Sequence, residues 1–218
     1  MIKREKKIHF GIMCFNTNFQ IWKAQTIQHL LNIKNVECKL LIIYDGEKSK
    51  KNNLAPRENF NTALWRYFQR TRKYKSSKSI DLSKTLINAD QIKCKINKKG
   101  KYSQYFENKD VIQIKKYKLD FILRFGFGII RGDILESAKY GIWSFHHGDE
   151  TRYRGGPPCF WEIYNNDRIT GSVLQMLNDK LDGGVILKKG YLKTNQSYSK
   201  NRDQMYFETA RWPSLVCI

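Results

Sequence analysis

Two stretches of this sequence contain side chains that could move protons and bind anions. The first is Ser144 to Asp149 (Ser-Phe-His-His-Gly-Asp), which leads into a basic loop rich in glycine and proline over residues 152–158. The second is the Leu-Asp-Gly-Gly turn of residues 181–184. An imidazole can polarise a carbonyl group or stabilise an oxyanion, and a carboxylate can accept a proton or hold the imidazole in one tautomer. Together they predict a proton-handling site.

The central prediction is that His146 and Asp182 act together as catalytic residues. A single histidine is more often structural, and Asp182-Gly183 is also an ordinary turn sequence. His146, however, ends an apolar run, precedes an irregular segment and lies close in sequence to the basic loop. The absence of a side chain at Gly183 would let the backbone approach a ligand closely.

The basic loop supplies further candidates. Arg152 and Arg154 could capture an anionic group of a substrate, since guanidinium groups bind such groups strongly, or they could simply form solvated surface. Tyr153 lies between them, and His147 and Asp149 precede them. We predict these five residues as substrate-binding residues. The five cysteines form no CxxC pair, which predicts reduced thiols and no metal site.

The elements that must position these residues predict an α/β fold. Residues 8–14, 20–33 and 36–44 indicate a strand, a helix and a strand, which together form a βαβ unit. Further on, we expect strands over 119–125, 141–146, 171–177 and 185–192, and helices over 132–139 and from 158. This order predicts a Rossmann-like, mostly parallel sheet with helices on both faces. His146 would then lie at the carboxyl end of a strand, where such sheets bind ligands.

Length and composition indicate one domain. The chain has 218 residues, of which 41% are hydrophobic, enough for a single α/β core. Residues 47–105 are rich in lysine, and we predict a poorly structured or inserted region there, apart from a helix with an aromatic stripe over 60–74. No apolar run is long enough to span a membrane, so we expect no membrane partner. The odd number of cysteines without a CxxC pair predicts reduced thiols and therefore a cytoplasmic protein.

The formal net charge of +20 raises the hypothesis of a nucleic-acid-binding protein. The lysines are, however, spread over many segments and mixed with asparagine and isoleucine, as in residues 48–53 and 93–99. We therefore do not expect nucleic acid as a partner. A basic surface would instead attract anionic substrates, such as phosphorylated or nucleotide-linked molecules.

The segment around His146 resembles the formyltransferases that use 10-formyltetrahydrofolate. Their catalytic stretch contains Asn-x-His and then Tyr-Arg-Gly, followed later by Leu-Asp-x-Gly. His146 matches the family's catalytic histidine, Tyr153-Arg154-Gly155 its Tyr-Arg-Gly, and Asp182 its catalytic aspartate. Residues 119–130 resemble the strand and loop that line the folate pocket. The resemblance thus implies that Phe125, Gly126, Phe127 and Gly128, together with Asp182 and Gly183, bind the folate.

One difference from the family falls on a catalytic position. Ser144 stands where the formyltransferases have asparagine, whose amide donates a hydrogen bond to the formyl oxygen. A serine hydroxyl is shorter but can also donate, so we predict Ser144 as a catalytic residue. Loss of one such donor can cost about 10²–10³ in rate. His147-Gly148-Asp149 also differs from the family pattern, which predicts a distinct branch marked by Ser-Phe-His-His-Gly-Asp.

The resemblance implies formyl transfer from 10-formyltetrahydrofolate to a small amine, for which an amino sugar is one candidate. Glycinamide ribotide and initiator methionyl-tRNA are less favoured acceptors, because the family's tRNA enzymes have an additional C-terminal domain and this sequence stops at Ile218. Two alternatives remain. The first is a hydrolase that releases formate from the folate, and the second is a folate-binding module without catalytic activity.

Overall fold

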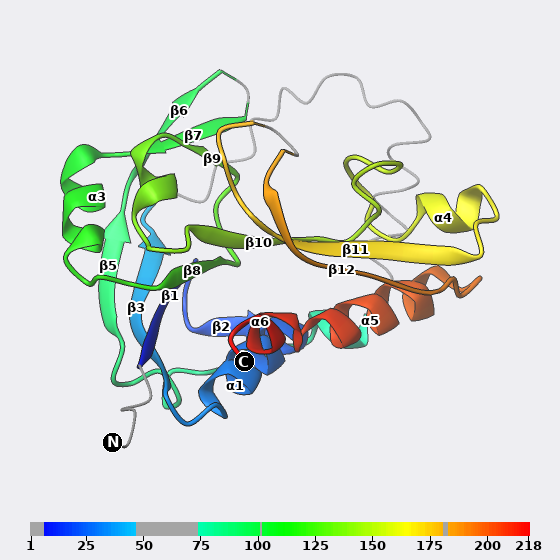
Figure 1. The fold of residues 1–218 in the computed structure, drawn as a ribbon, viewed down its shortest axis with the longest axis horizontal. Coiled ribbons are helices and arrows are strands. Elements are labelled where there is room, and N and C mark those ends of the chain that lie inside the picture. The colour runs from blue at the N-terminus through cyan, green and yellow to red at the C-terminus, as the bar shows by residue number, and fades with distance from the viewer. Residues whose placement is uncertain (1–6, 47–73, 101, 181–182) are drawn as a thin grey trace, which may run out of the picture.

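The computed structural model describes residues 7–46, 74–100, 102–180 and 183–218. Its centre is a seven-stranded sheet in the order β12-β11-β10-β8-β1-β3-β5 (Figure 1). From β10 to β5 all neighbouring strands are parallel, whereas β10, β11 and β12 pair antiparallel. The predicted mostly parallel, Rossmann-like sheet is confirmed. The strands are β1 (Ile8–Cys14), β3 (Val36–Tyr44), β5 (Asp90–Cys94), β8 (Phe121–Arg124), β10 (Ile142–His146), β11 (Ile169–Met176) and β12 (Val185–Lys193).

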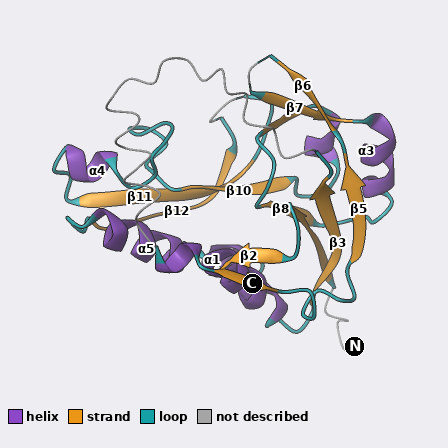
Figure 2. Ribbon diagram, turned by 180° about the vertical axis from the view of Figure 1, so that it is seen from behind, coloured by secondary structure: helices purple, strands orange, loops and turns teal. Residues whose placement is uncertain are grey.

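Helices cover both faces of this sheet, as predicted. On one face lie α1 (Ile21–Leu31), α5 (Tyr198–Thr209) and α6 (Trp212–Val216), and on the other α3 (Asn108–Lys115) and the 3₁₀ helix η2 (Asp133–Glu136) (Figure 2). The short helix α4 (Trp161–Tyr164) precedes β11. Each face has its own apolar core, because side chains of successive strand residues point to opposite faces of the sheet.

The structure corrects the prediction for part of the lysine-rich region 47–105. β5 extends the central sheet by parallel pairing with β3, and two small sheets lie beside it. The exposed lysines hid these strands in the sequence, although Ile92 and Cys94 on β5 are buried. The helix predicted over 60–74 lies outside the described residues except for Tyr74, which precedes the 3₁₀ helix η1 (Lys75–Ser77). The small strands are β2 (Asn18–Gln20) with β4 (Ser79–Asp81), and β6 (Ile96–Lys99), β7 (Ser103–Phe106) and β9 (Ile129–Arg131).

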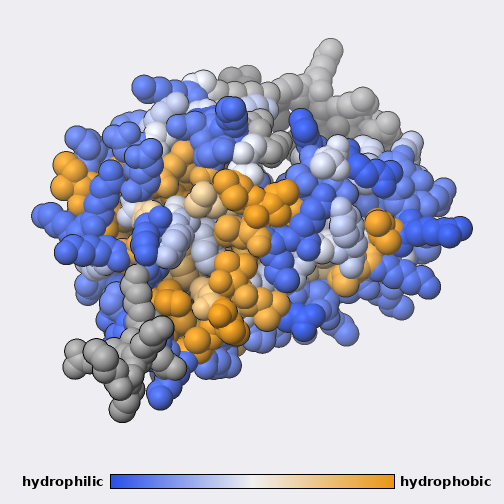
Figure 3. All heavy atoms as spheres, in the orientation of Figure 1, coloured by the Kyte–Doolittle hydropathy of each residue, from blue (hydrophilic) through white to orange (hydrophobic). Residues whose placement is uncertain are grey.

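Figure 3 shows hydrophilic side chains over much of one face, with an apolar patch across its middle. This distribution matches the wide spread of lysines along the sequence. No helix in the described part of the chain is both long and apolar enough to span a bilayer.

Candidate active site

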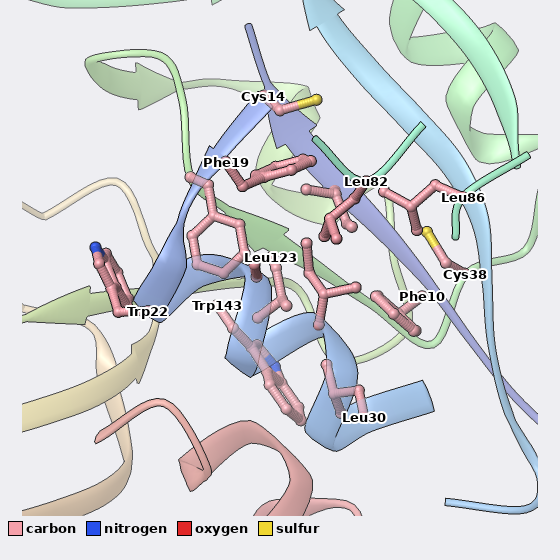
Figure 4. Close-up of a cluster of buried hydrophobic side chains, with 14 of the residues drawn as sticks. Phe10, Cys14, Phe19, Trp22, Leu30, Cys38, Leu82, Leu86, Leu123 and Trp143 are labelled. Atoms are coloured by element: carbon pink, nitrogen blue, oxygen red, sulfur yellow. The ribbon is translucent and has the colours of Figure 1, made fainter. Parts of the chain in front are cut away.

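The ends of β8 and β10 place polar side chains on one face of the sheet. Leu123 and Trp143 point into the core beneath α1 (Figure 4). They are paired neighbours on these two strands, so the next residues, Arg124 and Ser144, point to the opposite face. His146, two residues after Ser144, shares that face. The alternation of apolar and polar residues thus separates the core from a polar strip at the carboxyl ends of the strands.

This strip lines a pocket of about 140 Å³, here called the carboxyl-edge pocket. It contains Ser144 and His146, two of the three predicted catalytic residues. Three cationic side chains also line it, and no aspartate or glutamate does so among the described residues. The lining residues are Arg124, Gly128, Ile129, Ile130, Arg131, Ser144, Phe145, His146, Gln175, Leu177, Asn178 and Lys180.

The ring of His146 is oriented by the loop that follows β10. Its Nε2 lies 3.1 Å from the carbonyl oxygen of Tyr153. A carbonyl oxygen can only accept, so Nε2 must carry a proton and donate it. A Cβ on Gly148 would come within 3.2 Å of the same nitrogen, so the glycine leaves room for the ring. This arrangement leaves Nδ1 without a hydrogen bond to any described residue.

Ser144 is almost fully buried and is held by the guanidinium of Arg124. The Nε and Nη2 atoms of Arg124 donate to the Ser144 hydroxyl oxygen at 3.1 and 2.8 Å. Its Nη1 donates to the carbonyl oxygen of Gly128 at 2.7 Å. Burial lowers the pKa of the guanidinium, but an arginine pKa is so high that the group keeps its charge. The pocket therefore contains a fixed positive charge beside Ser144.

The predicted folate-binding run after β8 is used mostly for packing. Of its four residues, all described, only Gly128 lines the carboxyl-edge pocket. Phe125 is buried in the aromatic core beside α1, and Phe127, with φ +65°, packs its ring against other aromatic side chains. A Cβ on Gly126 would lie 3.1 Å from backbone atoms of Cys14, so this position has room only for glycine. Their folate-binding role stays a prediction.

His147 lies on the other face of the sheet from His146. Its ring stacks on Tyr206 at 3.8 Å, and its Nε2 lies 3.1 Å from the hydroxyl of Thr209. Burial, aided by the nearby positive charge of Arg202, lowers the pKa of His147 to about 3. This buried, neutral ring does not fit the predicted substrate-binding role, and strand alternation is the reason.

Asp149 shapes the loop rather than facing the carboxyl-edge pocket. Its Oδ1 accepts hydrogen bonds from the backbone N and the hydroxyl of Thr151, and it forms an ion pair with Lys189 at 3.3 Å. Burial would raise the pKa of this carboxyl, but the hydrogen bonds from Thr151 and Lys189 outweigh burial and hold the pKa below its ordinary value. Asp149 therefore remains ionised and fixes the turn that leads to Tyr153.

The side chains of the basic loop also bind within the protein. Arg152 forms an ion pair with Asp167 at 3.0 Å, and the hydroxyl of Tyr153 donates to the same carboxylate. Arg154 donates to the carbonyl oxygen of Glu150 at 3.2 Å. These contacts tie one donor of each arginine and the Tyr153 hydroxyl to groups beside the loop, and none of the three side chains lines the carboxyl-edge pocket, so their predicted capture of a substrate anion stays a prediction. The loop contributes the backbone oxygen of Tyr153 to the site instead.

Asp182 lies outside the described residues, so its role stays a prediction. The described residues around it lie near the site. The backbone N of Gly183 donates to the carbonyl oxygen of Lys180 at 3.2 Å. The carbonyl oxygen of Gly183 accepts a hydrogen bond from the side-chain amide of Asn178 at 2.5 Å. Lys180 and Asn178 both line the carboxyl-edge pocket. The described flanks of the Asp182 turn thus border the pocket that holds His146.

Sequence reasoning missed Arg124, Arg131, Gln175 and Lys180 as pocket residues. Arg124 had a detectable signal, because it is the charged residue in the otherwise apolar end of a predicted strand, residues 121–125. A charge at such a position needs a polar partner or a polar pocket. The other three had no comparable signal, since they come from β9, from β11 and from the turn after β11.

A larger hollow lies at the other end of the parallel strands, here called the amino-edge hollow. Its volume is about 910 Å³, and it contains both cationic and acidic side chains. None of the predicted site residues that the structure describes lines it. The lining residues are Lys7, His9, Lys115, Lys118, Leu119, Asp120, Leu135, Glu136, Ser137, Ala138, Lys139, Gly141, Met176, Leu177, Asn178 and Asp179.

Comparison of sequences finds relatives over part of the chain. Methionyl-tRNA formyltransferase of Prochlorococcus marinus is 35% identical over 89 residues, which cover 40% of this chain and 26% of that protein. The enzyme of the same name from Clostridium beijerinckii is 34% identical over 92 residues, or 41% of this chain and 30% of that protein. The matched segment thus spans between a quarter and a third of these relatives. No family model matches the chain.

Comparison of structures covers nearly the whole chain. Phosphoribosylglycinamide formyltransferase from Campylobacter jejuni superposes with a TM-score of 0.62 and 13% identity, covering 98% of this chain and 97% of that one. A formyltetrahydrofolate deformylase from Pseudomonas syringae superposes with a TM-score of 0.55 and 8% identity, covering 97% of this chain and 61% of that one. At these identities the likeness concerns the fold. The status of Ser-Phe-His-His-Gly-Asp as a branch signature stays a prediction. Over about two-fifths of its length this chain is similar in sequence to methionyl-tRNA formyltransferases, and over nearly all of it the fold is similar to that of a phosphoribosylglycinamide formyltransferase.

Proposed function

We propose that this protein transfers a formyl group from 10-formyltetrahydrofolate to a small amine. The observation that carries the proposal is the joint position of Ser144 and His146 in one pocket at the carboxyl end of β10. These residues match the catalytic Asn-x-His positions of the formyltransferases. The sequence relatives and the fold support the same activity.

In the proposed reaction, the chain's residues stabilise negative charge on the formyl oxygen. The amine nitrogen forms a bond to the formyl carbon, the carbonyl electrons move to oxygen, and the bond from carbon to the folate nitrogen then breaks. The hydroxyl of Ser144 donates a hydrogen bond to that oxygen and keeps its proton. His146 donates Nε2–H to Tyr153, so only its Nδ1 can reach the oxygen, and it donates there when the ring is doubly protonated. Such donors supply much of the rate in acyl transfer.

The reaction also requires one proton to pass from the amine to the folate nitrogen. We assign this transfer to Asp182, directly or through a water molecule, because a carboxylate near the site can serve as both acceptor and donor. This assignment rests on the sequence match and on the described flanks of the turn, Lys180 and Gly183. With this step, the products are a formamide and tetrahydrofolate, and the proton count balances.

The size and polarity of the pocket fit the reacting end of the folate. A volume of about 140 Å³ is below the roughly 300–1,000 Å³ of a typical ligand site. It suits a formyl group and an amine, with the rest of the folate outside. The folate supplies the formyl group, while this chain supplies hydrogen-bond donors from Ser144 and His146 and the pocket at the carboxyl ends of β8 and β10.

The charge of the pocket supports an anionic acceptor. Arg131 and Lys180 line it together with Arg124, and no acidic side chain lines it among the described residues. An amine that also carries a phosphate, diphosphate or carboxylate group would pair with these cations. A nucleotide-linked amino sugar is one acceptor of this kind.

The test is a transfer assay with purified protein, 10-formyltetrahydrofolate and a panel of amines. The panel contains nucleotide-linked amino sugars, neutral amino sugars, glycinamide ribotide and methionyl-tRNA. We expect tetrahydrofolate release that depends on an anionic amine and is lost in His146→Ala. The control is His29→Ala, which changes an exposed histidine on α1.

The other outcomes separate the alternatives. Formate release without any amine would identify a hydrolase. Folate binding without release of formate or tetrahydrofolate would identify a silent binding module. Turnover that is unchanged in His146→Ala would refute the proposed site.

A further inference from the structure

The pairing of Arg124 with Ser144 differs from an ordinary arginine–serine contact. Two atoms of one guanidinium, Nε and Nη2, both donate to the same hydroxyl oxygen, at 3.1 and 2.8 Å. A hydroxyl has two lone pairs and a single proton. Both lone pairs of Ser144 are therefore used as acceptors by Arg124, and only the proton remains available.

The Ser144 proton has no acceptor among the described residues, although the side chain is buried. Ser144 lines the carboxyl-edge pocket together with His146. Because the guanidinium fills the accepting side of the oxygen, the O–H bond must point away from Arg124. The hydroxyl is thereby fixed as a donor.

A second arginine–serine pair shows what the same contact does elsewhere. Arg202 donates to the hydroxyl oxygen of Ser76 at 2.8 Å, but there the hydroxyl donates its own proton to Asp203 at 2.6 Å. That pair lies beside the core of the other face, next to Tyr206. The Ser76 proton is used within the fold, whereas the Ser144 proton is not given to any described group.

Arg124 is itself held rigidly and keeps its charge at the pocket. Its Nη1 donates to the carbonyl oxygens of Gly128, at 2.7 Å, and of Phe127, at 3.5 Å. No carboxylate among the described residues forms an ion pair with it. A fixed guanidinium polarises the hydroxyl to which it donates, because its positive charge makes the O–H a stronger donor.

We propose that Arg124 is a positioning residue that fixes the Ser144 hydroxyl as the donor to the formyl oxygen. This inference rests on the proposed function and names the group that makes serine work at the position where formyltransferases have asparagine. An amide carries its own N–H donors, whereas a hydroxyl can turn. Arg124 removes that freedom and aims the proton into the pocket.

The test uses the carbonyl stretch of a folate carrying a ¹³C-labelled formyl group, recorded by infrared difference spectroscopy on the complex, together with kcat and KM. A hydrogen bond to the formyl oxygen lowers this frequency. We expect a lowered frequency in the wild type and a return toward the solution value in Ser144→Ala and Arg124→Met. We also expect each variant to lose about 10²–10³ in kcat, with little change in the KM for folate.

The double variant and a rescue distinguish positioning from a merely structural role. Because Arg124 acts through Ser144, Arg124→Met with Ser144→Ala should be no slower than the slower single variant. Ser144→Asn added to Arg124→Met should restore both kcat and the lowered frequency, since the amide does not need the arginine. The proposal would be overturned if the losses in kcat of the two single variants multiplied in the double variant. It would also be overturned if Arg124→Met changed only KM.

The control pair is Arg202→Met and Ser76→Ala, which should lower thermal stability and leave the carbonyl frequency unchanged. If Arg124→Met does not fold, Arg124→Lys replaces it. Lysine retains the charge but cannot donate to Ser144 from two nitrogens, so the carbonyl frequency should be intermediate. An unchanged frequency in Ser144→Ala overturns the proposal whatever the Arg124 variants do. If the wild type binds the folate and lowers the carbonyl frequency but transfers no formyl group, the proposed transferase function is refuted while the role of Arg124 stands. A wild type that does not bind the folate refutes both.

Discussion

The amino-edge hollow has a volume of about 910 Å³, whereas the carboxyl-edge pocket has only about 140 Å³. The larger hollow mixes lysines with Asp120, Glu136 and Asp179, so its charges partly cancel. The smaller pocket has Ser144, His146 and cationic side chains without an acidic neighbour among the described residues. In open α/β sheets, ligands bind at the carboxyl ends of strands. Position in the sheet and side-chain chemistry therefore favour the smaller cavity as the site, although its volume is lower.

The largest difference between the two cavities is expected when one polar group is removed from each. His146→Ala should lower turnover by about 10²–10³, because the ring stabilises the negative charge on the formyl oxygen in the proposed reaction. Glu136→Gln, in the amino-edge hollow, should leave turnover unchanged, since its exposed carboxylate lies at the other edge of the sheet. Steady-state kinetics of both variants provide the measurement, and a reversed pattern would move the site to the larger hollow.

His147 lines neither cavity and should affect stability rather than turnover. Its pKa is lowered to about 3 by burial, whereas in the unfolded chain it stays near 6.5. Below pH 6.5 the unfolded chain therefore binds one more proton, and stability should fall by up to about 1.4 kcal/mol per pH unit until about pH 3. Urea unfolding at several pH values measures this slope.

The matched variants for this pH dependence are His147→Phe and His29→Gln. The phenylalanine keeps an aromatic ring against Tyr206 but cannot titrate, so the slope below pH 6.5 should decrease by the contribution of one proton. His29→Gln changes an exposed side chain and should leave this contribution in place. Equal slopes in the wild type and His147→Phe would show that His147 is not buried in its neutral form.

A smaller effect is expected from the cations of the two cavities. Lys180→Gln should raise the KM for an anionic acceptor roughly tenfold, because one charge-assisted hydrogen bond is lost. Lys115→Gln, in the amino-edge hollow, should not change it. The measurement is the KM for each acceptor at low and high salt. An equal KM for charged and neutral acceptors in the wild type would contradict the anionic class.

The smallest effect should come from the basic loop. Arg152 is exposed and paired with Asp167, and exposed ion pairs contribute little to stability. Arg152→Gln should leave turnover unchanged and shift Tm by at most about 4 °C. A large rise in the KM for the acceptor would instead restore the substrate-binding role predicted from the sequence.

The sequence predicted the fold better than the details of the site. β1 and β3 lie where the apolar runs predicted them, and His146 ends its strand as expected. The local sequence is sufficient to predict these strands, because a buried strand appears as a short apolar run. β5 was missed, since the exposed Gln91 and Lys93 alternate with its buried residues and its pairing with β3 is a long-range contact.

Within the site, Ser144 and His146 were predicted, but the partners of the other candidates were not. That His147 turns to the core follows from strand alternation, yet its stacking on Tyr206 depends on a helix far along the chain. The basic loop was expected to bind substrate because of its arginines. Nothing in the sequence shows that Asp167 lies beside the loop and pairs with Arg152. The charge of Arg124 was detectable in the sequence, but its pairing with Ser144 was not, since that pairing depends on the distance between two neighbouring strands.

A crystal structure of the protein with a folate that carries a nonreactive formyl group would show where the reacting carbon lies. We expect the formyl oxygen in the carboxyl-edge pocket, about 3 Å from the hydroxyl oxygen of Ser144 and beside the ring of His146. Binding of the formyl group in the amino-edge hollow, or with its oxygen turned away from Ser144, would refute the proposed site.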